Sequence, residues 1–259
     1  MARVCIFCRS NIAKLTLEDV LPMWYLRRRQ GLGLFAHVSW SGTGPEHRHK
    51  SPLKVGVKIV CGACNNLWMS DIQRESSRFL EKMIDGQPIT LDSEGQRAVA
   101  AWLMMTAITW QFAVPGGKPI PESFVNDFYA MPAPRKPSAG VAVWIGRYSG
   151  PSRMATYCCD IARTVQANPE SAARIDTNRD APPFGATICL ENIVAQVAGF
   201  NISQTPVRFV LGNAMKFWQP IWPASPNLVS WPPQESIDEP VLQMLERAFN
   251  PPEPENAAS

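Results

Sequence analysis

The chain has 259 residues, of which 46% are hydrophobic and 18% are charged, a composition that supports a packed core and excludes a fibrous or wholly disordered protein. Its seven cysteines are too few and too unevenly spaced for a disulfide scaffold, so we expect a reducing, cytoplasmic compartment. The net charge of +3 is unevenly spread, because residues 1–60 hold ten Lys and Arg against three Asp and Glu, a net charge of +7. This basic segment is compatible with nucleic-acid binding and equally with a solvated basic face.

The N-terminal part of the chain shows no long helical periodicity and is framed by two Cys-x-x-Cys pairs. After the first pair, the segment from Leu17 to Arg29 predicts a short helix that begins after Pro22. Leu32 to Trp40 and Leu53 to Val60 alternate enough to predict two strands. Between them, the polar segment from Ser41 to Lys50 predicts a solvated loop.

Two helices are predicted after the second cysteine pair. Apolar residues at roughly helical spacing predict the first, from Trp68 to about Met83. Ser93 and Gln96 have capping-box spacing and predict the start of the second. The second helix contains the apolar run Ala98–Val114, which is about the minimum length for a membrane span. We expect a buried core helix because Thr and Gln interrupt the run, and no secretory leader opens the chain.

Beyond a Pro-rich stretch around residue 135 the pattern changes to strands. Runs with a period near two predict an antiparallel sheet, and four tryptophans are expected to supply its packing face rather than a ligand cage. An amphipathic helix from Pro240 to Phe249 and a disordered tail, Asn250–Ser259, are predicted to end the chain. The predicted strands are Val141–Tyr148, Arg153–Val165, Gly185–Val197, Arg208–Leu211 and Met215–Trp222, and the tryptophans are Trp144, Trp218, Trp222 and Trp231.

The strongest chemical signal is the pair of Cys-x-x-Cys motifs formed by Cys5, Cys8, Cys61 and Cys64. Each motif places two thiolates within reach of one tetrahedral ion, so together they predict a closed, structural zinc site. The 52 residues between the motifs exceed the separation in a compact zinc ribbon, so the ion would stabilise a whole inserted unit. A redox Cys-x-x-Cys would need only one pair, in a thioredoxin-like context that the pattern lacks. The other cysteines are interpreted as small buried residues: Cys158, Cys159 and Cys189.

The order of motifs around these cysteines resembles the HNH endonuclease family. The segment Leu15–Trp24 is similar to the family's acidic and hydrophobic segment that ends near a proline, and Val60–Ser70 is similar to its closing Cys-x-x-Cys-Asn turn into a helix. The resemblance covers about residues 3–75 and implies a ββα-metal fold pinned by zinc. Three later segments resemble longer HNH-family proteins of actinobacteria and their phages, namely Val143–Tyr148, Ile221–Pro223 and Val229–Pro233.

The resemblance also implies a catalytic centre. In the family a divalent ion contacts the scissile phosphate and is held by an acidic or His residue and by a His or Asn after the last cysteine. By position, Glu18 and Asn65 would hold Mg²⁺ or another divalent ion, and Asp19 falls where the family has its general-base His. Aspartate is the weaker base at neutral pH, with an ordinary pKa near 3.9 against about 6.5 for His. Gly56 falls where the family has an Asn that orients the base.

Basic residues near this centre predict how nucleic acid would be held. Their side chains would contact phosphates and position a duplex without reading its sequence, although a solvated charge run would have the same pattern. His47 and His49 could also replace the missing ligand or base, as could Asp71 or Glu75 on the following helix. The predicted nucleic-acid-binding residues are Arg27, Arg28, Arg29, His47, Arg48, His49 and Lys50.

These patterns predict an α+β fold with three parts. Residues 1–75 form a zinc-pinned, HNH-like module, residues 76–249 form a body of helices followed by an antiparallel sheet and a helix, and residues 250–259 form the tail. The predicted function is an HNH-like metal-dependent nuclease or nickase acting on nucleic-acid phosphodiesters, weakened or inactive through its base position. One alternative is a non-catalytic HNH-derived nucleic-acid-binding protein. Another is a phage-type regulator or inhibitor that contacts a protein partner through the Trp-rich C-terminal body, and no membrane association is expected.

Overall fold

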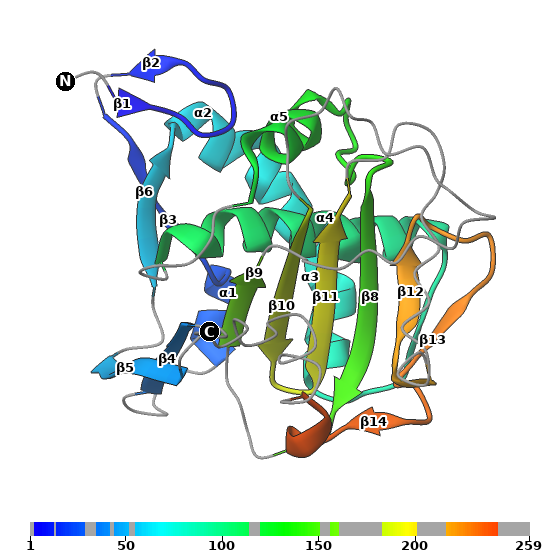
Figure 1. The fold of residues 1–259 in the computed structure, drawn as a ribbon. Helices are drawn as coiled ribbons and strands as arrows, with labels where there is room; N and C mark the ends of the chain where they lie inside the picture. The colour runs from blue at the N-terminus through cyan, green and yellow to red at the C-terminus, as the bar shows by residue number, and fades with distance from the viewer. Residues whose placement is uncertain are drawn as a thin grey trace, which may run out of the picture.

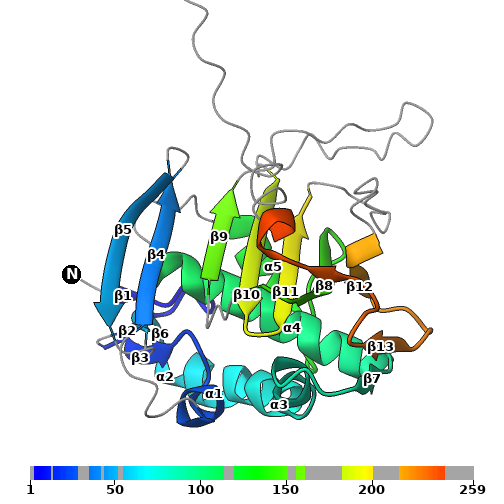
Figure 2. The same ribbon diagram turned by 90° about the horizontal axis from the view of Figure 1, so that it is seen from below.

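The fold is a mixture of helices and sheets, as the sequence predicts. A computed structural model describes residues 3–12, 14–28, 35–41, 44–51, 55–113, 120–150, 156–160, 183–200 and 216–242. Its main sheet, helix α4 (Ser93–Trp110) and helix α3 (Ser70–Ile84) lie in three layers, with α4 in the middle (Figures 1 and 2). This arrangement is consistent with the predicted α+β class.

The main sheet contains β8 (Val141–Tyr148), β9 (Thr156–Asp160), β10 (Phe184–Leu190), β11 (Ile193–Gly199), β12 (Gln219–Trp222) and β14 (Ser236–Ile237). The strand order is β12-β8-β11-β10-β9, and β14 pairs in parallel with β8. The other pairings in this sheet are antiparallel, as predicted. The run Gly185–Val197 is a hairpin rather than one strand, because Glu191 turns the chain with a left-handed φ of 53°.

Helix α4 is buried between the sheet and α3, and every residue from Ala98 to Trp110 is buried. A helix that is apolar on all sides is stable in a protein interior where both of its faces are covered. Its buried Thr109 hydroxyl donates a hydrogen bond to the Met105 carbonyl oxygen at 3.1 Å. Within the described ranges, no helix has both the length and the apolar composition needed to cross a membrane. The prediction of a core helix is therefore confirmed.

The N-cap of α4 is Asp92, not the predicted Ser93. The Asp92 carboxylate accepts a hydrogen bond from the Gly95 N–H at 2.7 Å, whereas Gln96 is buried and binds the backbone of Ser225. We expect Asp92→Ala to lower the free energy of unfolding by about 1 kcal/mol. The neighbouring change Ser93→Ala is expected to alter it by less than about 0.5 kcal/mol. Urea unfolding measures both values, and equal losses would contradict this cap.

The N-terminal segment places two antiparallel strands before helix α3. Strand β3 (Thr16–Asp19) pairs with β6 (Gly56–Val60), and β6 leads into the helical run that ends with α3. Between them the chain inserts α1 (Met23–Arg28), which confirms the short predicted helix, and the hairpin of β4 (Phe35–Ser41) and β5 (Gly44–Ser51). A second small hairpin, β1 (Arg3–Val4) with β2 (Asn11–Ile12), precedes them.

The predicted solvated loop from Ser41 to Lys50 is wrong, because most of it is strand β5. Only two residues separate the paired Ser41 and Gly44, and this is the length of a tight β-hairpin. Local pairing of the backbone therefore outweighs the polar composition of the segment. The predicted strand that ends at Val60 pairs with β3 instead of with the strand before it.

One hydrophobic core joins the N-terminal segment to the rest of the chain, since Phe7 and Trp102 belong to the same cluster of buried residues. A smaller cluster on the other face of the sheet contains Trp144 and Trp218, whereas Trp231 belongs to the main core. The predicted tryptophan face is thus divided between the two sides of the sheet. The remaining elements are α5 (Glu122–Ala130), a 3-10 turn (Gln111–Ala113), and the paired strands β7 (Ile89–Leu91) and β13 (Val229–Trp231).

Several predictions fall outside the described residues. They include the strand Arg208–Leu211, the tail Asn250–Ser259 and most of the closing helix, of which residues 239–242 are described and helical. Arg29 also lies outside the described residues. The structure describes only the backbone of β4, β5 and β9, so the side chains of Cys158 and Cys159 in β9 are not described. Cys189 is buried on the second face of the sheet, as predicted.

Candidate metal centre and acidic site

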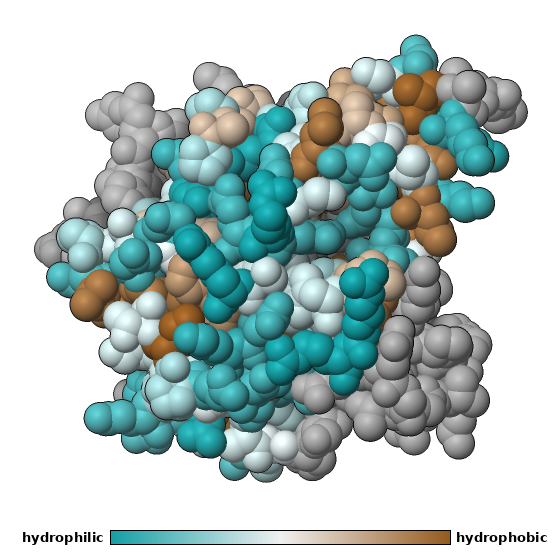
Figure 3. All heavy atoms as spheres, turned by 180° about the vertical axis from the view of Figure 1, so that it is seen from behind, coloured by the Kyte–Doolittle hydropathy of each residue, from teal (hydrophilic) through white to brown (hydrophobic). Residues whose placement is uncertain are grey.

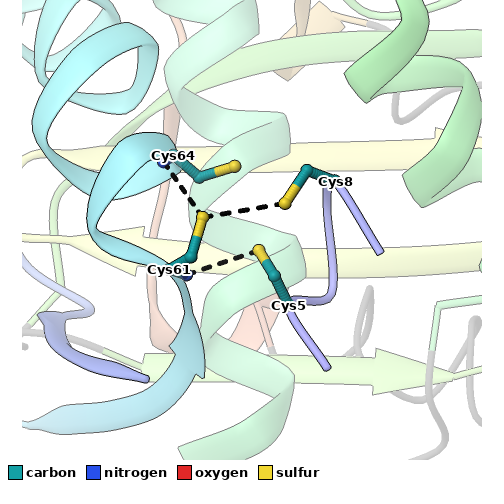
Figure 4. A group of neighbouring side chains, drawn as sticks. All are labelled: Cys5, Cys8, Cys61 and Cys64. Carbon is teal, nitrogen blue, oxygen red and sulfur yellow. Dashed lines mark hydrogen bonds between the residues drawn. The ribbon is translucent and has the colours of Figure 1, made fainter. Parts of the chain in front are cut away.

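Two pairs of cysteines that are far apart in the sequence lie together in the fold (Figure 4). The sulfur atoms of Cys5, Cys8, Cys61 and Cys64 all lie within 4.8 Å of one another. The Cys8 and Cys61 Sγ atoms are 3.6 Å apart, close to the edge of about 3.8 Å that a tetrahedron with Zn–S bonds of about 2.3 Å has. In the part of the chain that the structure describes, no other group of three or more His, Cys, Asp or Glu side chains could hold a metal ion. The four cysteines can hold a metal ion such as zinc.

The local backbone explains why the sulfurs converge. Cys61 directly follows β6 and is the N-cap of the short helix α2 (Gly62–Cys64), so its sulfur accepts a hydrogen bond from the Cys64 N–H at 3.4 Å. The Cys61 N–H in turn donates to the Cys5 sulfur at 3.4 Å. Such N–H···S bonds orient metal-bound thiolates and offset part of their charge. Burial raises the pKa of the Cys5 and Cys64 thiols, so their ionisation depends on a bound cation.

Aromatic contacts attach the cysteine cluster to α5. Trp68, in the helical run after Cys64, packs edge-on against Phe7 at a ring-centroid distance of 4.8 Å and against Phe128 of α5 at 6.0 Å. The Arg135 guanidinium lies over the Trp68 ring, 4.6 Å from its centroid. The four-cysteine cluster is therefore continuous with the core of the body.

Strand β3 buries a carboxylate and exposes a leucine. Glu18 is 5% exposed, whereas its neighbour Leu17 is 52% exposed, which reverses the usual distribution of charged and apolar residues. The register of the β3–β6 pair shifts between Thr16 and Glu18, with one extra residue in β6. Bulges of this kind redirect side chains and are common beside active sites. A buried carboxylate beside such a bulge makes Glu18 a candidate functional residue.

Two amide side chains lie at this carboxylate. The Gln73 side-chain N–H on α3 donates to the Glu18 Oε1 at 3.2 Å. Asn65 donates to the Thr16 hydroxyl at 3.2 Å and to the Leu17 carbonyl oxygen at 3.4 Å. Asn65 also begins a π-helical turn, Asn65–Met69, directly after the last cysteine. Short π-helical turns are frequent at functional sites.

The surroundings of Glu18 favour its protonated form. Burial raises the pKa of Glu18 to about 7, and the charge of Asp19 adds to this effect, while hydrogen bonds from Gln73 and Asn65 oppose it. The described neighbours that act on this carboxylate are one acidic side chain and two amides. A cation bound beside Glu18 would therefore restore its ionised form.

Asp19 and Asn65 both act on Glu18, through its neighbouring charge and a hydrogen bond respectively, and the structure adds a hydrogen bond from Gln73, which sequence reasoning missed. Gln73 precedes Leu80 by seven residues, so helical periodicity places both on one face of the predicted helix; a polar residue on that apolar face was the available signal. The proposed substitutes Asp71 and Glu75 bind arginines instead: Asp71 contacts Arg74 at 2.6 Å and Glu75 contacts Arg97 at 2.8 Å.

Gly56 cannot carry an orienting side chain without a rearrangement. It pairs with Asp19 across the two strands. A Cβ atom on Gly56 would lie 2.8 Å from the Leu17 side chain, closer than real Cβ contacts. The hydrogen bond that Gln73 donates from α3 goes to Glu18, not to Asp19. The histidines His47 and His49 lie in β5, and their side chains fall outside the description.

The predicted basic patch is partly neutralised by α3. Arg28, at the end of α1, pairs with Glu81 at 3.1 Å and also with Asp85. Arg27 beside it is exposed. The side chains of Arg48 and Lys50 lie outside the description.

No family model matches the chain, no curated protein matches it, and no solved structure matches it.

Proposed function

We propose that the chain is an HNH-like, metal-dependent nuclease or nickase that acts on nucleic-acid phosphodiesters. The observation that carries the proposal is the buried Glu18 on the inward face of β3, next to Asn65, the first residue after a four-cysteine cluster. The order of β3, β6 and α3 is that of a ββα unit, and zinc in the cluster would fix these elements relative to one another. The thiolates require a reducing compartment, for which we propose the cytosol.

In this proposal Glu18 and Asn65 hold a divalent ion such as Mg²⁺. Mg²⁺ keeps several water ligands and commonly takes one or two protein carboxylates with substrate phosphates, so a small donor set suits it. When bound, the ion would stabilise charge on the scissile phosphate and lower the pKa of a bound water. Gln73 holds the Glu18 carboxylate in position, and Asp19 accepts the proton of the attacking water. Because aspartate is a weak base at neutral pH, we expect slow cleavage.

A plasmid-nicking assay with Mg²⁺, Mn²⁺ or Ni²⁺ tests the proposal. We expect nicking by the wild type and a loss of about 10²-fold or more in Glu18→Ala, because the ion loses its carboxylate. Glu235→Ala, which removes an exposed carboxylate far along the chain, is the matched control and should retain full activity. Absence of nicking with every ion at high protein concentration, or equal activity of Glu18→Ala, would reject the nuclease.

A second candidate function is nucleic-acid binding without cleavage. Asp19 and Gly56 occupy the two positions where the family has its base and its orienting Asn, and this favours a chain that kept the metal centre and lost the chemistry. Salt-sensitive binding that survives Asp19→Ala, without nicking, would select it. A protein partner on the C-terminal body would meet residues other than Trp144, Trp218 and Trp231, since these side chains are buried.

A further inference from the structure

An open cavity of about 670 Å³ is lined by three arginines, of which Arg74 follows Gln73 of the acidic site in the sequence. It is formed by α3, the first turns of α4 and the segment after α5. The face behind the main sheet, on which α3 lies, is hydrophilic across its middle (Figure 3). We call the cavity the arginine groove; its lining residues are Arg74, Glu75, Arg78, Glu94, Arg97, Ala133 and Pro134.

One arginine of the groove is fixed in place. The side chain of Arg97 is 14% exposed, and it pairs with Glu75 at 2.8 Å. It also donates to the Arg135 carbonyl oxygen at 3.3 Å, which ties it to the wall of the groove. Arg135 itself donates to the Tyr129 and Met131 carbonyl oxygens and stacks on Trp68. The segment around Arg135, which forms one wall of the groove, is therefore held against Trp68, next to the four-cysteine cluster.

The other two arginines can exchange their partners. Arg74 and Arg78 lie one helical turn apart on α3, with side chains 73% and 55% exposed. Their partners Asp71 and Glu94 are also exposed, at 52% and 60%. Exposed ion pairs of this kind stabilise a protein by about 0–1 kcal/mol, so a phosphate can replace either carboxylate at little cost. The guanidinium group is suited to this exchange because its fork binds two phosphate oxygens at once.

Helix α3 carries residues of both the arginine groove and the acidic site. Arg74 follows Gln73, whose side chain binds Glu18. The residue of α3 that holds the Glu18 carboxylate, which lies on β3, therefore directly precedes the first arginine of the groove. Phosphates in a nucleic-acid strand are repeated at short intervals, so a strand whose scissile phosphate lies at Glu18 has others within reach of the groove.

We infer that the arginine groove binds the phosphate backbone of the nucleic acid next to the scissile phosphodiester, through Arg74 and Arg78. This inference rests on the proposed function in taking nucleic acid as the substrate, but it does not require cleavage. It moves the expected phosphate contacts from Arg28, which is paired with two less exposed carboxylates of α3, to Arg74 and Arg78, which are each paired with one exposed carboxylate. Each of the three arginines is paired with one carboxylate, but the partners of Arg74 and Arg78 are exposed, so an anion can compete with them.

The test is binding of a fluorescent 20-base-pair duplex, measured by anisotropy at several salt concentrations without added divalent ions. We expect Arg74→Ala combined with Arg78→Ala to weaken binding by about tenfold or more at 0.1 M salt, and to reduce the salt slope by about 2, because each phosphate contact contributes about 0.9 to that slope. Arg27→Ala combined with Arg28→Ala removes the same charge from α1 and is the matched control; it should have a clearly smaller effect.

A third variant is expected to strengthen binding of the duplex instead of weakening it. Glu94→Gln removes the carboxylate that neutralises Arg78 and should tighten binding, which a merely structural role of the pair would not cause. Equal effects of the two double variants, no tightening in Glu94→Gln, or no binding by the wild type would each overturn the inference. Competition with inorganic phosphate distinguishes a site for the nucleic-acid backbone from a site for the free phosphate ion. Displacement of the duplex by millimolar phosphate would show a site for the free ion and overturn backbone binding. If the groove variants behave as expected while no nicking is seen, the groove stands and the catalytic proposal fails.

Discussion

Cys61→Ser is expected to release the metal ion and to lower the free energy of unfolding by up to about 10 kcal/mol, the scale of structural zinc sites. The serine oxygen is a poor zinc ligand, and the three remaining thiols would be buried or half-buried without a cation. Since Phe7 and Trp102 share one core cluster, we expect the loss to reach the body and not only the N-terminal hairpins. Elemental analysis measures the metal, with one ion per chain expected in the wild type, and urea unfolding followed by tryptophan fluorescence measures the stability.

Cys189→Ser is the matched control for this prediction. Cys189 is fully buried in β10, on the far face of the sheet from the main core and away from the four-cysteine cluster. A buried hydroxyl in its place should destabilise the fold by about 1–3 kcal/mol and leave the metal content unchanged. Retention of one ion per chain by Cys61→Ser, or equal losses of stability in the two variants, would show that the cluster does not hold a structural ion.

Sequence reasoning predicted the elements whose signals are local and strong. The paired Cys-x-x-Cys motifs allow few other arrangements, and the helix around Trp102 is too apolar to lie anywhere but in a core. Sequence reasoning was wrong where the pairing of one strand with another decides the secondary structure. The polar segment around His47 forms a strand because a two-residue turn lets it pair with the strand before it, and residues 185–197 form two strands because Glu191 adopts a left-handed turn.

The site was predictable only in part, for a related reason. Glu18 and Asn65 were predicted from the resemblance to the HNH family, but their meeting depends on the β3–β6 register, which has a bulge that no local pattern reveals. Gln73 reaches Glu18 from 55 residues away, so its role depends on how α3 packs against β3. The neutralisation of Arg28 by α3 has the same origin, because ion pairs between distant segments leave no trace in a count of charges.

The burial of Glu18 is expected to make the free energy of unfolding depend strongly on pH. Its pKa is raised from 4.5 to about 7, mainly by burial. Between these values the folded chain binds the proton more tightly than the unfolded chain, so the stability falls as pH rises from about 4.5 to 7. A shift of about 2.5 units corresponds to roughly 3 kcal/mol at pH 8. Glu18→Gln keeps an oxygen that accepts from Gln73 and removes the charge, so relative to the wild type it should gain about 3 kcal/mol between pH 4 and pH 8.

Urea unfolding of both proteins at pH 4 and pH 8 measures this difference, in which the contributions of all other titrating groups cancel. Glu235→Gln, at an exposed carboxylate, should show a difference from the wild type that does not change with pH. If Glu18 also binds a divalent ion, added Mg²⁺ at pH 8 should stabilise the wild type and not Glu18→Gln, because only the wild type offers a carboxylate to the ion. A pH-independent difference would contradict the burial of a charged Glu18, whereas the expected pH dependence with no response to Mg²⁺ would leave the buried carboxylate intact and argue against the catalytic ion.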